Sequence, residues 1–155
     1  MAKVKDIAEA LVGDVLKSAE FEGEGRWRLN FQAGAWLNLE TPWRLLADGR
    51  PVFGGCDHGQ WFGHDKPIDG TLRLQETLAG RPITLVNLCQ KTGDLTVEFE
   101  GDRKIQTFNE SSGYESWLLQ TAAGQIVAVG GGEVHFVNDV APGHEIGIHE
   151  DERDI

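Results

Sequence analysis

The sequence predicts an α+β domain in which an antiparallel sheet, or two packed sheets, is built from two repeated β-meanders. Three observations favour this fold. The order of strand-like runs and glycine turns over residues 26–55 recurs over residues 94–131, the N-terminal segment has helical spacing, and a second helix-like segment connects the halves. We therefore expect an N-terminal helix and one connecting helix packed against the sheet.

The two helices are predicted from apolar spacing and from proline and glycine. Apolar residues three and four positions apart place one stripe on a helix over residues 3–19, followed by a polar break over residues 20–25. Pro67 suits the first turn of a second helix and Gly80 suits its end, which predicts a helix over residues 68–79. The stripe of the first helix consists of Val4, Ile7, Ala8, Leu11, Val12, Val15 and Leu16.

Apolar runs bounded by turn residues predict the strands. Trp27, Leu29 and Phe31 alternate with polar residues, as expected for a strand with one buried face. Asp48 and Gly49 form a strong hairpin signal between two such runs. The predicted strands are residues 27–31, 36–39, 43–46 and 52–53 in the first half and residues 83–89, 95–99, 104–108, 115–120, 125–129 and 133–137 in the second.

The length of 155 residues is sufficient for one domain with its own core, which we place at residues 1–138. Residues 139–155 form an acidic segment that we expect to be a flexible tail. The sequence contains no run of about 20 apolar residues and no apolar leader segment at its start, so neither a membrane span nor secretion is expected. Cys56 and Cys89 are then expected to be reduced thiols in a cytoplasmic protein, with Cys89 buried in a strand.

The charge balance bears on the class of partner. The chain has 25 acidic and 14 basic residues, which gives a formal net charge of −11. Such a chain repels phosphate backbones, so we expect no nucleic acid as a partner. The same charge accelerates encounter with a basic protein, although it also serves solubility alone.

A glycine-rich loop over residues 54–66 contains several residue types that bind metals. Its side chains lack the pair-and-pair spacing typical of zinc sites, so we predict no metal and no cofactor. A metal-dependent or hydrolytic enzyme centred on Cys56, His58 and His64 is kept as an alternative. Otherwise Asp57 and His58 are expected to make turn and capping hydrogen bonds.

We predict no catalytic residues. Ser111, Ser112, Ser116 and Cys56 are the candidate nucleophiles, but none lies in a Gly-x-Ser-x-Gly motif. The glycines at 130–132 follow a strand without a subsequent helix, so they do not form a phosphate-binding loop. A bulge or a close approach of backbone explains them better.

Aromatic residues provide the candidate binding surface. Trp27, Trp36, Trp43 and Trp117 lie in predicted strands and are expected mostly in the core. Trp61 and Phe62 instead lie in the glycine-rich loop, where they either anchor a partner or cover the end of the sheet. Together with the loop over residues 109–114, the candidate partner-binding residues are Asp57, His58, Trp61, Phe62, Glu110, Tyr114 and Glu115.

Four short strings carry a resemblance to a known group of proteins. They are Trp43-Arg44-Leu45-Leu46, Asp57-His58-Gly59-Gln60, Thr92-Gly93-Asp94-Leu95 with Phe99, and Ser111-Ser112-Gly113-Tyr114-Glu115-Ser116-Trp117. Over residues 26–131 the chain resembles an uncharacterised family of small acidic bacterial proteins with a Gly-Asp-Leu…Phe and Tyr-Glu-x-Trp signature. Members of this family resemble immunity proteins of polymorphic toxin systems, which implies binding to a toxin and carries over no catalytic residue.

The expected function is therefore a non-enzymatic protein-binding module, an immunity protein that neutralises a cognate bacterial toxin by occlusion. One alternative is the enzyme built on the loop of residues 54–66. A further alternative is a structural, self-associating domain in which Trp61 and Phe62 form a homodimer contact.

Overall fold

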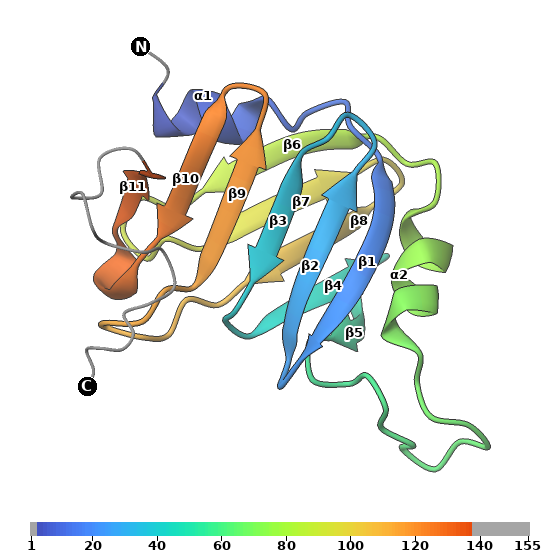
Figure 1. Ribbon diagram of the computed structural model, residues 1–155. Helices are drawn as coiled ribbons and strands as arrows, with labels where there is room; N and C mark the ends of the chain where they lie inside the picture. Colours follow the sequence, from blue (N-terminus) through green and yellow to red (C-terminus); the bar gives the residue numbers. More distant parts are fainter. Residues whose placement is uncertain (1–2, 138–155) are drawn as a thin grey trace.

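The computed structural model describes residues 3–137, which form two antiparallel β-sheets packed face to face, with a short helix at each open side (Figure 1). The α+β class is thus confirmed in its broad form. The first sheet has the order β1 (Leu16–Gly23), β2 (Arg26–Phe31), β3 (Trp36–Leu39), β9 (Trp117–Thr121), β10 (Gly124–Ala128) and β11 (Val134–Phe136). The second has the order β5 (Arg50–Gly54), β4 (Trp43–Ala47), β8 (Arg103–Thr107), β7 (Leu95–Phe99) and β6 (Ile83–Leu88).

The chain changes sheets twice, after β3 and after β8. The first sheet therefore combines β1–β3 with β9–β11, and the second combines β6–β8 with the hairpin of β4 and β5. Pairing of β3 with β9 and of β4 with β8 joins these parts. The sandwich consequently cannot separate into two halves without breaking both sheets.

Alternation along the strands fills the space between the sheets. In the first sheet, Leu29, Leu37 and Leu119 are paired neighbours across β2, β3 and β9, and all three are fully buried. The second sheet has the equivalent row Val97, Ile105 and Leu45 across β7, β8 and β4. Burial of such side chains contributes about 1.5–3 kcal/mol each relative to exposure.

Helix α2 (Gly70–Leu78) covers one open side of the sandwich by binding the edge strands of both sheets. The side chain of Gln75 donates a hydrogen bond to the Lys17 carbonyl oxygen on β1 at 3.0 Å. On the other edge, Arg73 Nη1 donates to the Val52 carbonyl oxygen on β5 at 2.7 Å. These bonds protect edge-strand groups that would otherwise be open to pairing with another chain.

Helix α1 (Val4–Glu9) covers the opposite side, next to β6, β9 and β10. Thr121 Oγ1 donates to the Ile7 carbonyl oxygen at 2.9 Å, and the segment after the helix pairs with β6 through Ile83 N and the Asp14 carbonyl oxygen at 2.8 Å. Both helices therefore act as edge covers as well as core elements.

The predicted helix over residues 3–19 is wrong beyond its first turns, and the predicted break over residues 20–25 is mostly strand β1. Gly13 adopts φ of +93°, which a right-handed helix cannot contain. The start of the strand was missed because Leu16 continues the helical spacing of Leu11, Val12 and Val15, although it already belongs to β1. The pairing of β1 with β2 is irregular between Leu16 and Ser18.

The predicted helix over residues 68–79 exists but begins later. Asp69 is the N-cap, and its carboxylate accepts a hydrogen bond from Leu72 N at 3.2 Å. Pro67 and Ile68 stay outside the helix, because the Ile68 backbone is paired with the preceding loop. Gly80, with φ of +69°, follows the helix as expected.

The remaining strand predictions are confirmed, with ends shifted by one or two residues. Trp27, Trp43 and Trp117 are buried as expected, but the prediction is wrong for Trp36. Its ring lies on the outer face of the first sheet, where the Arg28 guanidinium sits 4.2 Å from the ring centroid. Cys89 is also not buried as expected, because it follows β6 in a turn and is half-exposed.

The segment of residues 139–155 lies outside the described residues. Within residues 3–137, no helix is long and apolar enough to cross a membrane.

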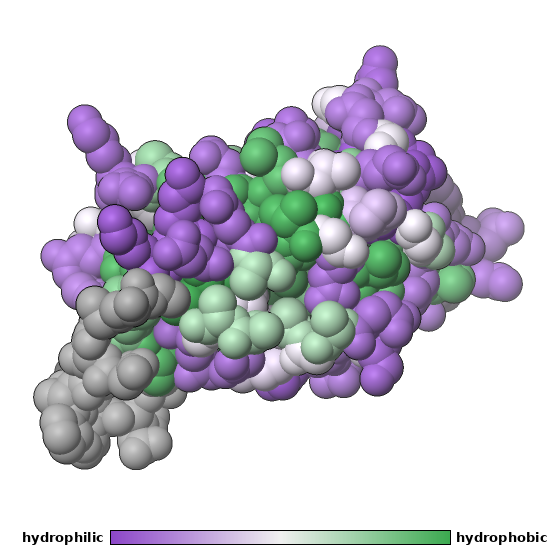
Figure 2. Space-filling view, turned by 90° about the horizontal axis from the view of Figure 1, so that it is seen from above, coloured by the Kyte–Doolittle hydropathy of each residue, from purple (hydrophilic) through white to green (hydrophobic). Residues whose placement is uncertain are grey.

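The two ends of the sandwich differ. At the upper end in Figure 1 the chain makes short turns, and the view onto this end shows hydrophobic residues at its centre surrounded by hydrophilic ones (Figure 2). At the lower end a long loop between β5 and α2 extends away from the sheets (Figure 1). This loop contains most of the candidate binding residues.

Gly70, at the start of α2, provides a test of the packing beneath this helix. A Cβ atom there would lie 2.6 Å from the Trp27 ring and would also overlap the Phe53 ring. We expect Gly70→Ala to lower the free energy of unfolding by about 1–3 kcal/mol, as overpacking does. Gly113→Ala is the matched control in urea denaturation, because a Cβ there meets nothing within 4 Å. Equal loss in both variants would contradict this packing.

Candidate functional site

The long loop is attached to the scaffold by a cluster of aromatic rings. Trp27 is fully buried, and its Nε1 donates to the Gly55 carbonyl oxygen at 2.9 Å. Its ring meets Trp43 and Phe53 edge to face, with centroids 6.0 and 5.6 Å apart. Since Trp27 belongs to the first sheet and Trp43 and Phe53 to the second, the loop begins where the two sheets are joined.

His58 attaches the loop to α2. Its Nδ1 accepts the backbone N–H of Gly70 at 2.9 Å, and its ring centroid lies 4.6 Å from that of Phe21. Asp57 Oδ2 accepts the backbone N–H of Gly54 at 2.8 Å. Both side chains therefore make the turn and capping bonds that the sequence suggested, and they fix the base of the loop.

Beyond His58 the loop forms a short hairpin-like stem. Gly59 N donates to the Ile68 carbonyl oxygen and Ile68 N donates to the Gln60 carbonyl oxygen, both at 2.8 Å. A turn closes the tip, where His64 N donates to the Trp61 carbonyl oxygen at 2.8 Å. The aromatic residues at the tip are thus presented by an ordered backbone.

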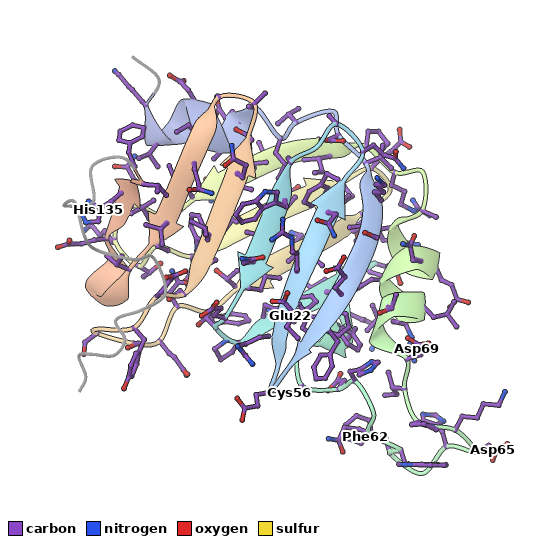
Figure 3. All side chains as sticks on the ribbon, viewed as in Figure 1. Glu22, Cys56, Phe62, Asp65, Asp69 and His135 are labelled. Atoms are coloured by element: carbon purple, nitrogen blue, oxygen red, sulfur yellow. The ribbon has the colours of Figure 1, made fainter. Side chains whose placement is uncertain are left out.

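The tip exposes two adjacent large aromatic side chains. Trp61 is 56% exposed and Phe62 is 62% exposed. Figure 3 shows Phe62 and Asp65 on the part of the loop that extends beyond the sheets. Both rings lie outside the buried core, so this pair does not contribute to it. It remains available for another molecule.

The second candidate loop lies between β8 and β9. Ser111 Oγ accepts the backbone N–H groups of Gly113 and Tyr114 at 3.0 and 2.8 Å, which leaves Tyr114 75% exposed. The three-residue helix η1 (Gly130–Gly132) supports this loop, because a Cβ on Gly130 would overlap the backbone of Gly113. This is the close backbone approach expected for the glycines at 130–132.

Glu110 is exposed and Glu115 is half-buried in the same loop. Both loops leave the lower end of the sandwich but point to opposite sides of it (Figure 1). The structure therefore does not bring Trp61 and Phe62 together with Tyr114 in one compact patch.

Arg44 lies between the two loops and was not among the predicted site residues. Its guanidinium lies 5.1 Å from the centroid of the Phe108 ring, at the start of the second loop. On its other side it lines a groove of about 380 Å³ together with Phe62, Arg73 and further residues. The sequence does indicate that the Arg44 side chain lies outside the core. It stands between Trp43 and Leu45, which are both buried, so alternation along β4 places it on the outer face.

The metal and nucleophile candidates are not assembled into a site. Within residues 3–137, no group of three or more His, Cys, Asp and Glu side chains is arranged to hold a metal ion. Cys56, His58 and His64 therefore do not form such a group, and His58 Nδ1 is engaged by Gly70. Ser116 is buried, and Ser111 Oγ serves the turn before Tyr114.

Cys89 has a chemical property that the sequence did not suggest. The Thr92 hydroxyl, with help from the backbone N–H groups of Thr92 and Lys91, lowers the pKa of the Cys89 thiol below its ordinary value. The thiolate is therefore more abundant near neutral pH than in an ordinary cysteine.

Comparison with known proteins provides no relative. No family model matches this sequence, and neither a curated protein nor a solved structure is significantly similar to it.

The hydrogen bond from Gly70 to His58 is testable with two substitutions that both remove the ring. His58→Ala leaves the Gly70 N–H without its acceptor, so we expect a loss of about 1–3 kcal/mol in unfolding free energy. Hydrogen exchange at Gly59 and Ile68 should accelerate. His58→Asn retains an acceptor near the same place and should recover part of both effects. Indistinguishable behaviour of the two variants would contradict the role of this bond.

The environment of Cys89 predicts a pH-dependent reaction rate. In a Cys56→Ser background, Thr92→Val removes the hydroxyl donor, so the pKa of Cys89 should rise and less thiolate should be present at pH 7. Alkylation by iodoacetamide should then slow at pH 7 and approach the parent rate at high pH, where both thiols are ionised. An unchanged rate at pH 7 would show that Thr92 does not stabilise the thiolate.

Proposed function

We propose that this protein is a non-enzymatic protein-binding module of the immunity type, which neutralises a cognate bacterial toxin by occluding it. The observation that carries the proposal is the exposed pair Trp61 and Phe62 on a loop whose backbone is held by hydrogen bonds. Aromatic side chains provide much of the energy of protein interfaces when they enter a pocket on the partner. An ordered loop presents them with little loss of conformational entropy on binding.

The charge of the chain supports a basic partner. The net charge of −11 attracts a positively charged protein before contact and accelerates association. A toxin that acts on phosphate-containing substrates is such a protein. In this proposal the electrostatic field brings the partner close, and the aromatic tip fixes the complex.

The compartment and oligomeric state belong to the same proposal. Cys56 and Cys89 are both free thiols, which supports a reducing compartment such as the cytoplasm. A homodimer formed through the same aromatic tip is the competing arrangement. It would compete with the toxin for Trp61 and Phe62, so the two arrangements are separable by experiment.

We also infer that β1–β5 and β6–β10 are two copies of one unit. In this correspondence each unit contributes three strands to one sheet and a hairpin to the other. The strand registers support it, because Leu37 pairs with Leu119 as Ile105 pairs with Leu45. The helices support it as well, because each precedes the first strand of its own unit and packs on the first strand of the other. α1 precedes β1 and packs near β6, and α2 precedes β6 and packs on β1.

The duplication bears on function through the place where the copies differ. After β10 the chain makes the short η1 and continues into β11, whereas after β5 it makes the long loop with Trp61 and Phe62. The base of the loop, with Gly55 and His58, supports the scaffold, but its tip packs against no core residue in the described part of the chain and has no counterpart in the second copy. This difference supports a binding role for the loop.

The test is co-expression with the product of the adjacent gene, followed by co-purification. We expect a stable complex and protection of cells from that product. Trp61→Ala should weaken binding by at least about 2 kcal/mol, as at other aromatic hot spots. Leu85→Ala is the control, because Leu85 is 49% exposed on β6, away from the loop.

Two results would refute this function. One is the absence of both a complex and protection, and the other is equal weakening of the complex by the two substitutions. Light scattering adds a further criterion. A dimer that dissociates in Trp61→Ala would assign the aromatic tip to self-association and would contradict the toxin-binding role.

A further inference from the structure

A groove between the long loop, β4, β5 and α2 is lined by two arginines, although the chain as a whole has a net charge of −11. It has a volume of about 380 Å³. Arg44 contributes from β4 and Arg73 from α2, and both side chains are half-buried. The lining also includes Asp57 and the apolar residues Val52, Phe62 and Ile68.

Both guanidinium groups are fixed by the scaffold. Arg44 Nε donates to Gln106 Oε1 at 3.0 Å, and its guanidinium rests on the Phe108 ring. Arg73 Nη1 donates to the Val52 carbonyl oxygen at 2.7 Å. Each group therefore retains further N–H donors in a set orientation, and a ligand would meet them without much loss of side-chain entropy.

Neither arginine has an acidic partner in the described chain. Within residues 3–137, the ion pairs involve other residues, and Arg44 and Arg73 form none. Asp57 is the only acidic residue among those lining the groove, and its Oδ2 accepts the Gly54 N–H. Half-buried cations without a counter-ion are unfavourable, so an anion that enters the groove gains from both.

We infer that this groove binds a small organic acid, in which one carboxylate is attached to an apolar group about the size of one amino-acid side chain. Guanidinium groups bind carboxylates in planar, paired geometry. Val52, Ile68 and the Phe62 ring provide the apolar contact for the rest of the ligand. The volume is at the lower end of the range of about 300–1,000 Å³ typical of small-molecule sites, which suits a ligand of this size.

The apolar part of the lining distinguishes this ligand from inorganic phosphate. A phosphate ion would satisfy the arginines but would leave the apolar surface in contact with water. This inference does not depend on a protein partner, although the two sites share Phe62. A bound acid would hold one side of the aromatic tip and so connect the groove with the proposed interface.

The experiment titrates the full 155-residue chain with N-acetylphenylalanine and follows the Nε–Hε resonances of Arg44 and Arg73 by NMR. N-acetylphenylalaninamide is the neutral match of the same shape. The acid should shift both resonances to saturation and should bind at least about tenfold more tightly than the amide, as expected for charge-assisted hydrogen bonds. Inorganic phosphate should bind more weakly than the acid.

Three variants separate the groove from general charge effects. Arg44→Gln and Arg73→Gln should each reduce the affinity for the acid about tenfold, towards that of the amide. Arg50→Gln is the control. It removes the same charge, but Arg50 lies on β5 outside the groove lining. Thermal unfolding verifies each fold. Because Arg73 also supports β5, Arg44→Gln decides the question if Arg73→Gln unfolds.

Several results would overturn the inference. Equal affinity for acid and amide would remove the role of the carboxylate, and phosphate binding as tight as that of the acid would remove the role of the apolar group. Equal weakening by Arg50→Gln would assign the effect to net charge. None of these outcomes affects the toxin-binding test, which depends on Trp61.

Discussion

The burial of Trp27 between the two sheets is the constraint on which the lower end of the molecule depends. Its ring contacts residues from both sheets, and its N–H is satisfied only by the Gly55 carbonyl oxygen. A buried indole without that acceptor would incur the cost of an unsatisfied polar group, about 1–3 kcal/mol. Burial of Trp27 in the core therefore also fixes the position of Gly55, the first residue of the loop. Gly70 extends the same constraint to α2, because only a residue without a side chain fits against these rings.

Edge protection explains why the helices are short and where they lie. A two-sheet sandwich has four edge strands. Here α2 covers β1 and β5 through side-chain bonds to their backbone carbonyls. On the other side α1 packs beside the edge strands β6 and β11, and Thr121 on the inner strand β9 donates to its Ile7 carbonyl oxygen. These contacts need only short helices, of nine and six residues. Pro51 on β5 adds protection, because it cannot donate to an incoming strand. The long loop is free to extend from this closed structure without exposing an edge to aggregation.

Local patterns in the sequence predicted the strands and turns well, because alternation and glycine turns are local properties. They failed at Leu16, which begins β1 but continues the helical spacing of Leu11, Val12 and Val15. Trp36 was wrongly expected in the core. It alternates with Leu37 and Leu39 along β3, and these two leucines occupy the face that is buried. For the site, exposure of Trp61 and Phe62 follows from a loop of unusual composition. The groove at Arg44 and Arg73 could not be predicted, since β4 and α2 meet there only after the intervening loop has folded.

The acidic charge of the chain and the arginine groove act over different distances. At physiological salt, charges more than about 8 Å away are largely screened. A molecule within that distance still responds to the acidic charge of the chain, which has a net charge of −11. Within contact range, the fixed guanidinium groups of Arg44 and Arg73 dominate, because few water molecules separate them from a bound group. A basic protein and a small acid can therefore use neighbouring parts of one surface. Phe62 belongs to both parts, so the aromatic tip is the element through which occupancy of the groove would reach a bound partner.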